Sequence, residues 1–424
     1  MGFAELWDSL LPLGRDPQTG GYRRFSFTTA DAACREWFCD HAAQRSLRLQ
    51  TDRNGNLWAW WDLPSDGGVP GGEAPRSGGP GVIPRINTAV ATGSHLDSVP
   101  DGGAYDGPLG VVSGFAAIDL LRARGFVPAR PIAVAAFWEE EGGRFGVACL
   151  ASRLLTGAAA PQAARELRDS GGMSLAEAMA GTGLDPGRLG ADEELLDTIG
   201  AFVELHVEQG RALAGLGAAV GIAEGIWPHG RWRLDFTGRA DHAGTTRLAD
   251  RRDSMLPYAA TVLAARQAAA SHAALATFGK MTAEPGGANA ICSAVRAWLD
   301  ARAPDEATLD RMVEQVEAAA RHAAAEHGVG IEVRRESFTP RVEFDRGLRD
   351  RLAAALARRG ITAPVLPTGA GHDAGILAAR LPAAMLFVRN PSGVSHSPAE
   401  HADPADCEAG VIALAAVLEE LAGP

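Results

Sequence analysis

The chain has 424 residues, of which 46% are hydrophobic and 22% charged, a globular composition that excludes a largely disordered chain. The net charge of −12 argues against a nucleic-acid partner, which needs a basic face. No apolar run reaches the ~18–20 residues that span a bilayer, and the acidic start lacks the basic region of a signal peptide. The five cysteines are odd in number and show no zinc-knuckle or CxxC spacing. We therefore expect a cytoplasmic protein with reduced thiols and no membrane partner.

Short apolar runs alternate with helical patterns in the first half of the chain and again near its end. The expected strands are residues 56–61, 88–93, 131–138, 201–207 and 383–388. A helix is expected at 111–124. Strands separated by helices predict βαβ units, and hence an α/β fold with a mixed, mostly parallel sheet flanked by helices. The Gly- and Pro-rich stretch 65–84 predicts a flexible surface loop.

The middle of the chain predicts a smaller second domain. Arg231–Phe236 alternates polar and apolar residues, as an antiparallel strand with one solvated face does. The elements expected to follow are a helix at 253–270, a strand at 295–301, a helix at 306–326 and a strand at 331–335. This order predicts an α+β module at 226–338, inserted into a discontinuous first domain made of 1–225 and 339–424.

Four polar clusters follow predicted strands. In chain order they are Gly93–Gly107, Trp138–Phe145, Glu204–Gly210 and Gly393–Glu400. Ligands of open α/β sheets bind beyond the carboxyl ends of the strands, so all four clusters are expected at one edge of the sheet.

The residue types in these clusters favour a metal site. Imidazole and carboxylate ligands together suit zinc, manganese, cobalt or nickel better than calcium or magnesium. Three consecutive glutamates, 139–141, repel one another after a buried strand, and a cation bound to at least one of them relieves this repulsion. Asp97 lies two residues after His95 and is placed to accept a hydrogen bond from its imidazole. Each cluster alone also has a structural interpretation, but their repeated placement after apolar strands favours a metal.

In order and spacing the four clusters resemble those of the amidase/hydantoinase/carbamoylase branch of the dinuclear metal hydrolases. This branch includes allantoate amidohydrolase and N-carbamoyl-L-amino acid hydrolase. The resemblance runs from about Leu6 to the C-terminus and includes Thr368–Gly375. It implies a zinc-exopeptidase-like catalytic domain with two divalent metal ions per subunit, zinc or manganese, with cobalt or nickel also suited. It further implies that the inserted domain is a lid and forms a homodimer.

The resemblance also implies a role for each matched residue. The metal ligands would be His95 and His206 for one ion, Glu141 and His396 for the other, and Asp106 as the bridge. Glu140 would be the general base, and His242 of the inserted domain would polarise the scissile carbonyl. The substrate-binding residues would be Gln209, Asn289 and Arg302.

The implied reaction is hydrolysis of a linear carbon–nitrogen bond in a small carboxylated ureido compound, with release of ammonia and carbon dioxide. Allantoate and N-carbamoyl-L-amino acids are the expected substrates. One alternative is a dinuclear metal exopeptidase or N-acyl-amino acid hydrolase, which applies the same chemistry to a peptide or acyl amide. A second alternative is a metal-binding scaffold without catalysis, against which the intact Glu140 and the five ligands argue.

Overall fold

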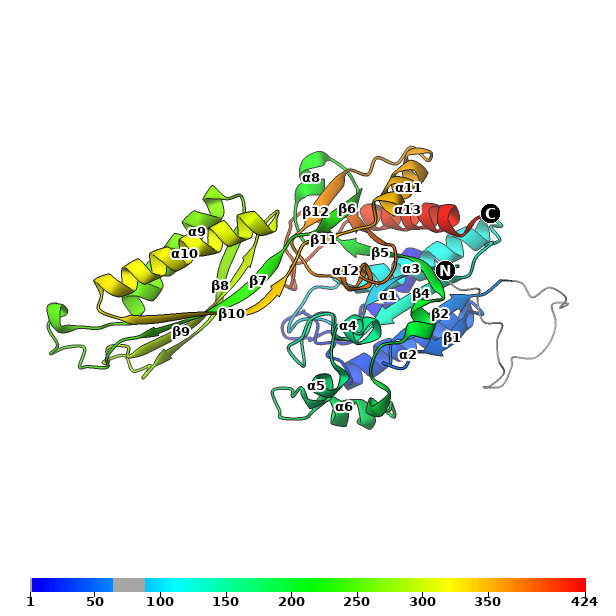
Figure 1. The fold of residues 1–424 in the computed structure, drawn as a ribbon. Coiled ribbons are helices and arrows are strands. Elements are labelled where there is room, and N and C mark those ends of the chain that lie inside the picture. Colours follow the sequence, from blue (N-terminus) through cyan, green and yellow to red (C-terminus); the bar gives the residue numbers. More distant parts are fainter. Residues whose placement is uncertain (1, 64–87) are drawn as a thin grey trace. The chain divides into compact units, whose positions relative to one another are not determined.

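The computed structural model describes residues 2–63 and 88–424, so the predicted surface loop 65–84 lies outside the described residues. The chain divides into two compact units (Figure 1). Unit 1 comprises Met1–Glu224 and Glu343–Pro424, and unit 2 comprises Gly225–Val342. The sequence placed the inserted module at 226–338.

Unit 1 contains a nine-stranded sheet and helices that cover it. Its strands are β1 (Arg48–Thr51), β2 (Leu57–Trp61), β3 (Ala89–His95), β4 (Ile132–Phe137), β5 (Ile199–Val207), β6 (Val220–Ile226), β11 (Val342–Glu343), β12 (Val365–Thr368) and β13 (Ala383–Val388). Its helices are α1 (Phe3–Leu10), α2 (Thr29–Gln44), α3 (Pro108–Ala123), α4 (Leu150–Thr156), α5 (Pro161–Glu166), α6 (Leu175–Gly181), η1 (Pro186–Arg188), α7 (Glu193–Leu196), α8 (Ala212–Leu216), α11 (Arg346–Ala357), α12 (Asp373–Leu377) and α13 (Pro404–Ala422).

The strand order of this sheet creates a place for a site. The order is β1-β2-β4-β3-β5-β13-β6-β11, with β12 beside β6. The four central strands β4, β3, β5 and β13 run parallel, which confirms the predicted α/β fold. The chain passes from β3 to β4 on one side and resumes at β5 on the other, so the order reverses between β3 and β5. Ligands of open α/β sheets bind at such a reversal.

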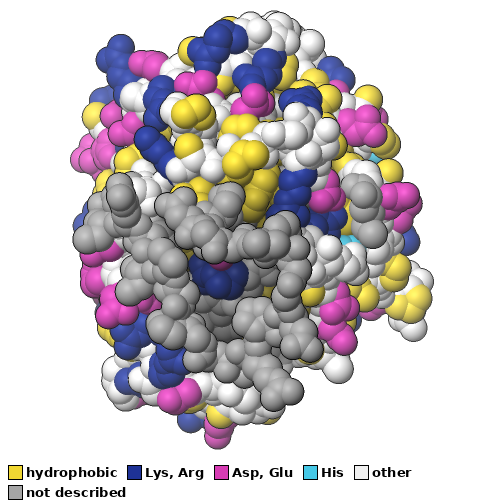
Figure 2. Space-filling model, turned by 90° about the vertical axis from the view of Figure 1, so that its right-hand side faces the viewer, with side chains coloured by type: hydrophobic (Ala, Val, Ile, Leu, Met, Phe, Trp, Pro, Cys, Tyr) yellow, Lys and Arg dark blue, Asp and Glu magenta, His cyan; other side chains and the backbone are white. Residues whose placement is uncertain are grey.

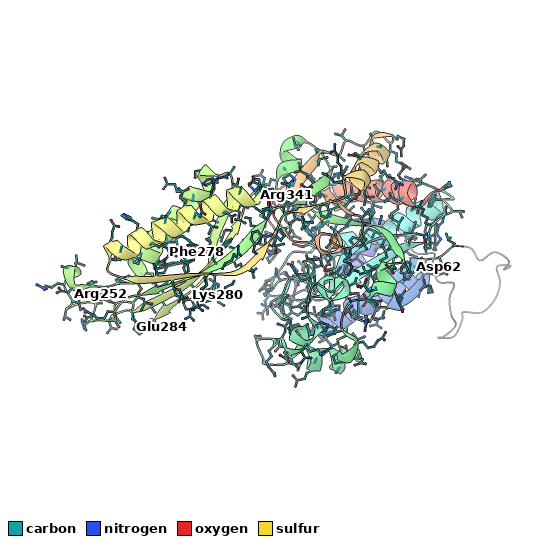
Figure 3. All side chains as sticks on the ribbon, in the orientation of Figure 1. Asp62, Arg252, Phe278, Lys280, Glu284 and Arg341 are labelled. Carbon is teal, nitrogen blue, oxygen red and sulfur yellow. The ribbon has the colours of Figure 1, made fainter. Side chains whose placement is uncertain are left out.

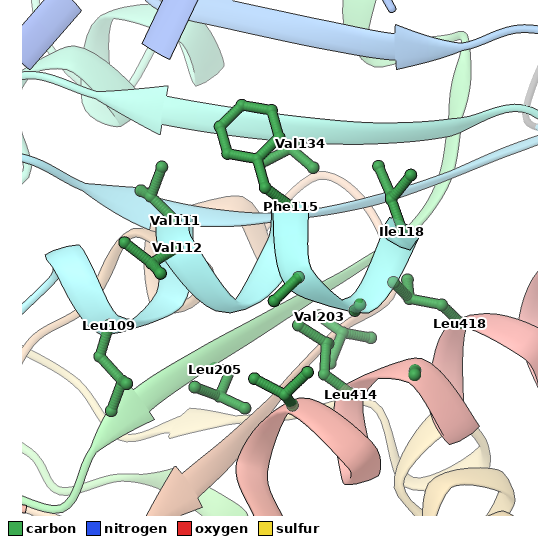
Figure 4. Close-up of a cluster of buried hydrophobic side chains, with 14 of the residues drawn as sticks. Leu109, Val111, Val112, Phe115, Ile118, Val134, Val203, Leu205, Leu414 and Leu418 are labelled. Atoms are coloured by element: carbon green, nitrogen blue, oxygen red, sulfur yellow. The ribbon is translucent and has the colours of Figure 1, made fainter. Parts of the chain in front are cut away.

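Alternation along β5 separates the core from the site. Val203, Leu205 and Val207 join α3 and α13 in one large hydrophobic cluster, part of which is drawn in Figure 4. Successive side chains of a strand point to opposite faces of the sheet, so Glu204 and His206 lie on the other face, and both are buried. One strand thus supplies the core on one face and site residues on the other.

Unit 2 is a four-stranded antiparallel sheet packed against two helices. Its elements are β7 (His229–Thr237), η2 (Leu248–Asp250), α9 (Met255–Ser271), β8 (Leu275–Glu284), β9 (Ala294–Arg302), α10 (Glu306–Glu326) and β10 (Gly330–Thr339). The strand order is β10-β7-β9-β8. The alternation predicted for Arg231–Phe236 is confirmed, because Trp232, Leu234 and Phe236 are buried among the helix side chains.

The surface carries charges of both signs. On the face shown in Figure 2, lysine and arginine side chains of the described residues are interspersed with aspartate and glutamate. A surface that binds a nucleic-acid backbone instead gathers its basic side chains on one face. Among residues 2–63 and 88–424, no helix is both long and apolar enough to cross a membrane.

The core of unit 1 predicts a stability effect. Phe115 of α3 is completely buried and lies in the cluster of Figure 4. Phe115→Ala should lower the free energy of unfolding by about 3–5 kcal/mol, because it removes apolar contacts and leaves a cavity. Denaturant unfolding followed by tryptophan fluorescence measures the change. Val127→Ala is the control, because Val127 is 65% exposed, and it should change the free energy by less than about 0.5 kcal/mol. Equal effects of the two substitutions would contradict this description of the core.

Candidate metal centre

Two histidines stand at the strand-order reversal. His95 is the last residue of β3, His206 lies near the end of β5, and both side chains are completely buried. The pairing of β3 with β5 extends only to Thr92 and Val203. Beyond that pair the strand ends are free to hold other groups between them.

Asp106 lies between these histidines. Its Oδ1 is 3.1 Å from Nε2 of His206 and 3.5 Å from Nε2 of His95. The turn before α3 requires glycine at the next position, because Gly107 has a φ of +84° and a Cβ there would lie 2.4 Å from the His95 ring. The backbone therefore brings a carboxylate against two imidazoles that other elements hold.

The protons of both imidazoles point away from Asp106. Nδ1 of His206 is 2.8 Å from the carbonyl oxygen of Val207, and Nδ1 of His95 is 3.1 Å from that of Asp97. A carbonyl oxygen only accepts hydrogen bonds, so each Nδ1 donates and the lone pair of each neutral ring lies on Nε2. Nε2 of His95 is buried without a hydrogen-bond partner among the described residues. Nε2 of His206 accepts the backbone N–H of Gly107 at 3.2 Å, whereas Nε2 of His95 faces the carboxylate with no donor between them. An imidazole lone pair beside a carboxylate oxygen is an arrangement that a metal cation completes.

The electrostatics of this group favour a positive charge. Burial raises the pKa of Asp106, but the rings of His206 and His95 in their protonated form outweigh burial and hold that pKa well below its usual range. Burial lowers the pKa of His95, but Glu140, Asp106 and Asp97 outweigh it and raise that pKa well above its usual value. The site thus stabilises positive charge among its acids, which is what a divalent cation supplies.

A second group of ligand atoms surrounds the other oxygen of Asp106. Nε2 of His396 is 3.5 Å from Asp106 Oδ2 and 3.3 Å from Glu141 Oε2. These three residues and the group of His95, Asp106 and His206 each offer ligand atoms within 4.8 Å of one another. Asp106 belongs to both groups and presents one oxygen to each. The five ligands implied by the resemblance therefore lie together.

The turn after β13 positions His396. The side-chain oxygen of Asn390 accepts hydrogen bonds from the backbone N–H groups of Ser392 and Gly393, and its amide nitrogen donates to the carbonyl oxygen of Val394. Asn390 is completely buried, whereas the His396 side chain is 49% exposed. A buried amide thus fixes a tight turn that carries an accessible candidate ligand.

Glu140 lies beside the ligands but belongs to neither group. Its Oε2 is 3.6 Å from Nε2 of His95, and its Oε1 accepts a 3.3 Å hydrogen bond from the thiol of Cys149. Burial, together with the neighbouring acids, raises the pKa of Glu140 well above its usual value. A carboxyl group with a raised pKa beside a metal site is suited to accept and return a proton.

The neighbour Glu139 has a different role. Its Oε1 accepts hydrogen bonds from the backbone N–H groups of Arg144 and Phe145, and burial raises its pKa to about 7. This carboxyl group orders the loop that follows the three glutamates, which is a structural function.

Asp97 contacts His95 differently from the expectation. The hydrogen bond from Nδ1 of His95 goes to the backbone oxygen of Asp97, and the carboxylate oxygen is farther away, at 3.5 Å. The carboxylate instead accepts the backbone N–H groups of Glu140 and Glu141 at 3.2 and 3.1 Å. Asp97 therefore joins the first two clusters, because it holds both the His95 imidazole and the glutamate segment.

Gln209 reaches the same centre. Its amide nitrogen donates to Asp106 Oδ2 at 2.7 Å and lies 3.3 Å from both Ser395 Oγ and His396 Nε2. The side chain follows β5 and so enters from the same strand end as His206.

Sequence reasoning assigned no role to Glu400, although it quoted the cluster that contains it. Glu400 Oε1 accepts the backbone N–H groups of Tyr105 and Asp106 at 2.8 and 3.0 Å, and Oε2 lies 3.1 Å from Ser395 Oγ. Burial raises its pKa to about 7. Glu400 anchors the backbone of the shared aspartate, and only its acidic character after the histidine could have indicated this.

His372 was also missed, although it lies in the segment Thr368–Gly375 that carries the resemblance. Its ring packs against that of His206, with centroids 4.5 Å apart, and neither ring nitrogen has a hydrogen-bond partner among the described residues. Burial lowers its pKa well below the usual value. A neutral, buried imidazole with unsatisfied nitrogens beside a ligand is a further candidate for contact with a metal or substrate.

The remaining predicted residues, His242, Asn289 and Arg302, belong to unit 2. His242 and Asn289 are exposed and lie on adjoining loops, where the backbone N–H of Ala243 donates to the backbone carbonyl oxygen of Asn289 at 3.0 Å. Arg302 ends β9 and donates to both carboxylate oxygens of Asp300 at 2.8 and 3.3 Å.

Comparison with known proteins identifies the family of the chain. The model of peptidase family M20/M25/M40 matches residues 91–420. The chain belongs to this family. It is 35% identical over 420 residues to an N-carbamoyl-L-amino acid amidohydrolase of Geobacillus stearothermophilus, covering 98% of each chain. It is 31% identical over 415 residues to an allantoate amidohydrolase of Escherichia coli, covering 97% of this chain and 96% of that one.

A solved structure resembles the chain over its whole length. A hydantoinase/carbamoylase family amidase from Burkholderia ambifaria aligns with a TM-score of 0.81 and 31% identity, over 100% of this chain and 98% of that one. The resemblance found in the sequence is thereby confirmed. This M20 protein is a metal-dependent amidohydrolase, a hydrolase of carbon–nitrogen bonds other than peptide bonds.

Proposed function

We propose that this M20 protein hydrolyses a linear carbon–nitrogen bond in a small carboxylated ureido compound, allantoate or an N-carbamoyl-L-amino acid. The observation that carries the proposal is Asp106, which presents one oxygen to each of two ligand groups while Glu140 lies beside them and in neither. Two divalent ions at a shared carboxylate are the arrangement used for hydrolysis. The ligands would be His95, Asp106 and His206 for one ion and Asp106, Glu141 and His396 for the other.

The proposed chemistry divides between the ions and the chain. Zinc or manganese, with cobalt or nickel also suited to these ligands, supplies Lewis acidity that lowers the pKa of water and stabilises negative charge on oxygen. Glu140 accepts a proton from the attacking water and returns it to the departing nitrogen. The water oxygen bonds to the ureido carbon, the carbon–nitrogen bond breaks, and ammonia leaves. The remaining carbamate gives carbon dioxide and the free amine.

Unit 2 would supply the substrate contacts. His242 would donate a hydrogen bond to the carbonyl oxygen as negative charge develops there, and Asn289 would bind beside it. Arg302 would hold the substrate carboxylate with two parallel hydrogen bonds, the geometry it already makes with Asp300. Gln209 would contribute from unit 1, where its amide already reaches Asp106.

We also propose that unit 2 acts as a lid and forms a homodimer. β8 is an edge strand, and its Leu275 and Met281 are 56% and 37% exposed. Leu263 of the neighbouring α9 is 71% exposed. An edge strand with exposed apolar side chains favours pairing with another chain. We further propose a cytoplasmic location, because the five cysteines are all free and thiols stay reduced in that compartment.

Glu140→Gln should abolish turnover without loss of metal, because Glu140 moves the proton and is not a ligand. We expect kcat to fall by about 10²–10⁴-fold. Ammonia release measures turnover, and inductively coupled plasma mass spectrometry measures bound metal. Glu139→Gln is the matched control, since Glu139 orders a loop, and it should keep most of the activity. A Glu140→Gln enzyme that still turned over at the control's rate would contradict the role of the base.

The substrate class is tested by ammonia release from allantoate and from an N-carbamoyl-L-amino acid, each with the manganese- or zinc-loaded enzyme. Release from either one supports the proposal, and the faster reaction identifies the substrate. Release from neither, together with cleavage of dipeptides or N-acyl amino acids, would replace the ureido substrate by a peptide or acyl amide.

A further inference from the structure

The loop that carries His242, here called the His242 loop (Ala240–Thr246), is joined by its backbone to the segment of Asn289. The backbone N–H of Ala243 donates to the backbone carbonyl oxygen of Asn289 at 3.0 Å, and that of Ile291 donates to the backbone carbonyl oxygen of Asp241 at 2.9 Å. These two bonds form a short ladder on one side of the loop. His242 and Asn289 are therefore carried on two segments whose backbones are hydrogen-bonded to each other.

The His242 ring is held by its own loop. The backbone N–H of Gly244 donates to Nδ1 of His242 at 3.0 Å. An imidazole nitrogen that accepts a hydrogen bond carries the lone pair, so the proton of the neutral ring lies on Nε2. The exposed ring thus presents an N–H donor to its surroundings. A donor is what stabilises negative charge on a carbonyl oxygen.

The side chain of Arg251 donates hydrogen bonds to two backbone carbonyl oxygens of the His242 loop. Its Nη2 donates to the carbonyl oxygen of Ala243 at 2.7 Å, and its Nε donates to that of Thr246 at 3.1 Å. The carbonyl of Ala243 and the N–H of Gly244 belong to one peptide group. In a planar trans peptide these two bonds point in opposite directions. When Arg251 fixes the carbonyl, it therefore aims the N–H at His242.

The charge of Arg251 adds to this geometric effect. A charge-assisted hydrogen bond is stronger than a neutral one, and a bond to the carbonyl polarises the peptide group and strengthens its N–H as a donor. We propose that Arg251 is a positioning residue, which orients the Ala243–Gly244 peptide so that His242 is held as an Nε2–H donor. The proposal rests on the proposed function for the part that concerns activity.

Arg251→Met tests the proposal, with Arg252→Met as the matched control. Arg252 is the next residue along the chain, is exposed, and its guanidinium makes no hydrogen bond or ion pair with the described residues; Figure 3 labels it in unit 2. With the better substrate of the two named above, Arg251→Met should lower kcat by about 10–100-fold and leave KM nearly unchanged. Arg251→Lys should restore part of the loss, and Arg252→Met should resemble the wild type.

A double-mutant cycle separates positioning from a general structural role. If Arg251 acts through His242, Arg251→Met should add no further loss of kcat in a His242→Ala background. An equal loss in both backgrounds, or a wild-type kcat in Arg251→Met, would overturn the proposal. If His242→Ala alone kept full activity, the catalytic role of His242 would fail, and with it the part of this proposal that concerns activity.

The tautomer is measured without any substrate. In wild-type enzyme labelled with ¹⁵N-histidine, the His242 resonances, assigned by their loss in His242→Ala, should show an unprotonated Nδ1 and a protonated Nε2 at neutral to mildly alkaline pH. Arg251→Met should shift them toward a mixture of the two tautomers. Unchanged resonances in Arg251→Met would overturn the structural part of the proposal, whatever the activity shows.

Discussion

The candidate site of unit 1 depends on one electrostatic constraint, the convergence of candidate ligand atoms on the buried carboxylate of Asp106. Both neighbouring imidazoles direct their N–H groups to backbone carbonyls and turn their lone pairs toward the acid. A third histidine, His396, and the carboxylate of Glu141 lie near the other oxygen of Asp106. Such a group of acceptors is costly to bury unless a cation lies among them. The supporting contacts of Asp97, Gly107 and Glu400 all serve to keep it assembled.

The sheet brings these groups together from distant parts of the chain. Strand order reverses between β3 and β5, so the two buried histidines leave neighbouring strands at the same edge. Alternation along β5 gives one face to the hydrophobic core and the other to Glu204 and His206. The glutamates after β4 and the turn after β13 complete the set. Placement of the site is thus a consequence of topology more than of any single loop.

The sequence predicts those features that leave a local trace. Apolar runs followed by polar clusters located β3, β4, β5 and β13 and the candidate ligands at their ends. β8 was missed because it is largely exposed and so lacks the apolar alternation that marks a strand. Glu400 and His372 were missed for another reason. What they do depends on contacts with Asp106 and His206, far away in the chain, which no local pattern encodes.

The same distinction explains the outcome for Asp97. Spacing in the sequence correctly placed it beside His95, but it could not tell which of its oxygens would face the ring. The backbone oxygen accepts the imidazole proton, and this leaves the carboxylate to hold the glutamate segment. A role shared between two clusters becomes visible only once both strand ends are placed together.

We propose that two metal ions share Asp106, and the metal content per chain is the measurement that decides this. Wild type, Asp106→Ala and His396→Ala would be loaded with zinc or manganese, dialysed and analysed by plasma mass spectrometry, with folding checked by circular dichroism. We expect about two ions in the wild type, about one in His396→Ala and fewer than one in Asp106→Ala, because only Asp106 belongs to both groups. A folded Asp106→Ala enzyme that retained the metal content of the wild type would contradict it.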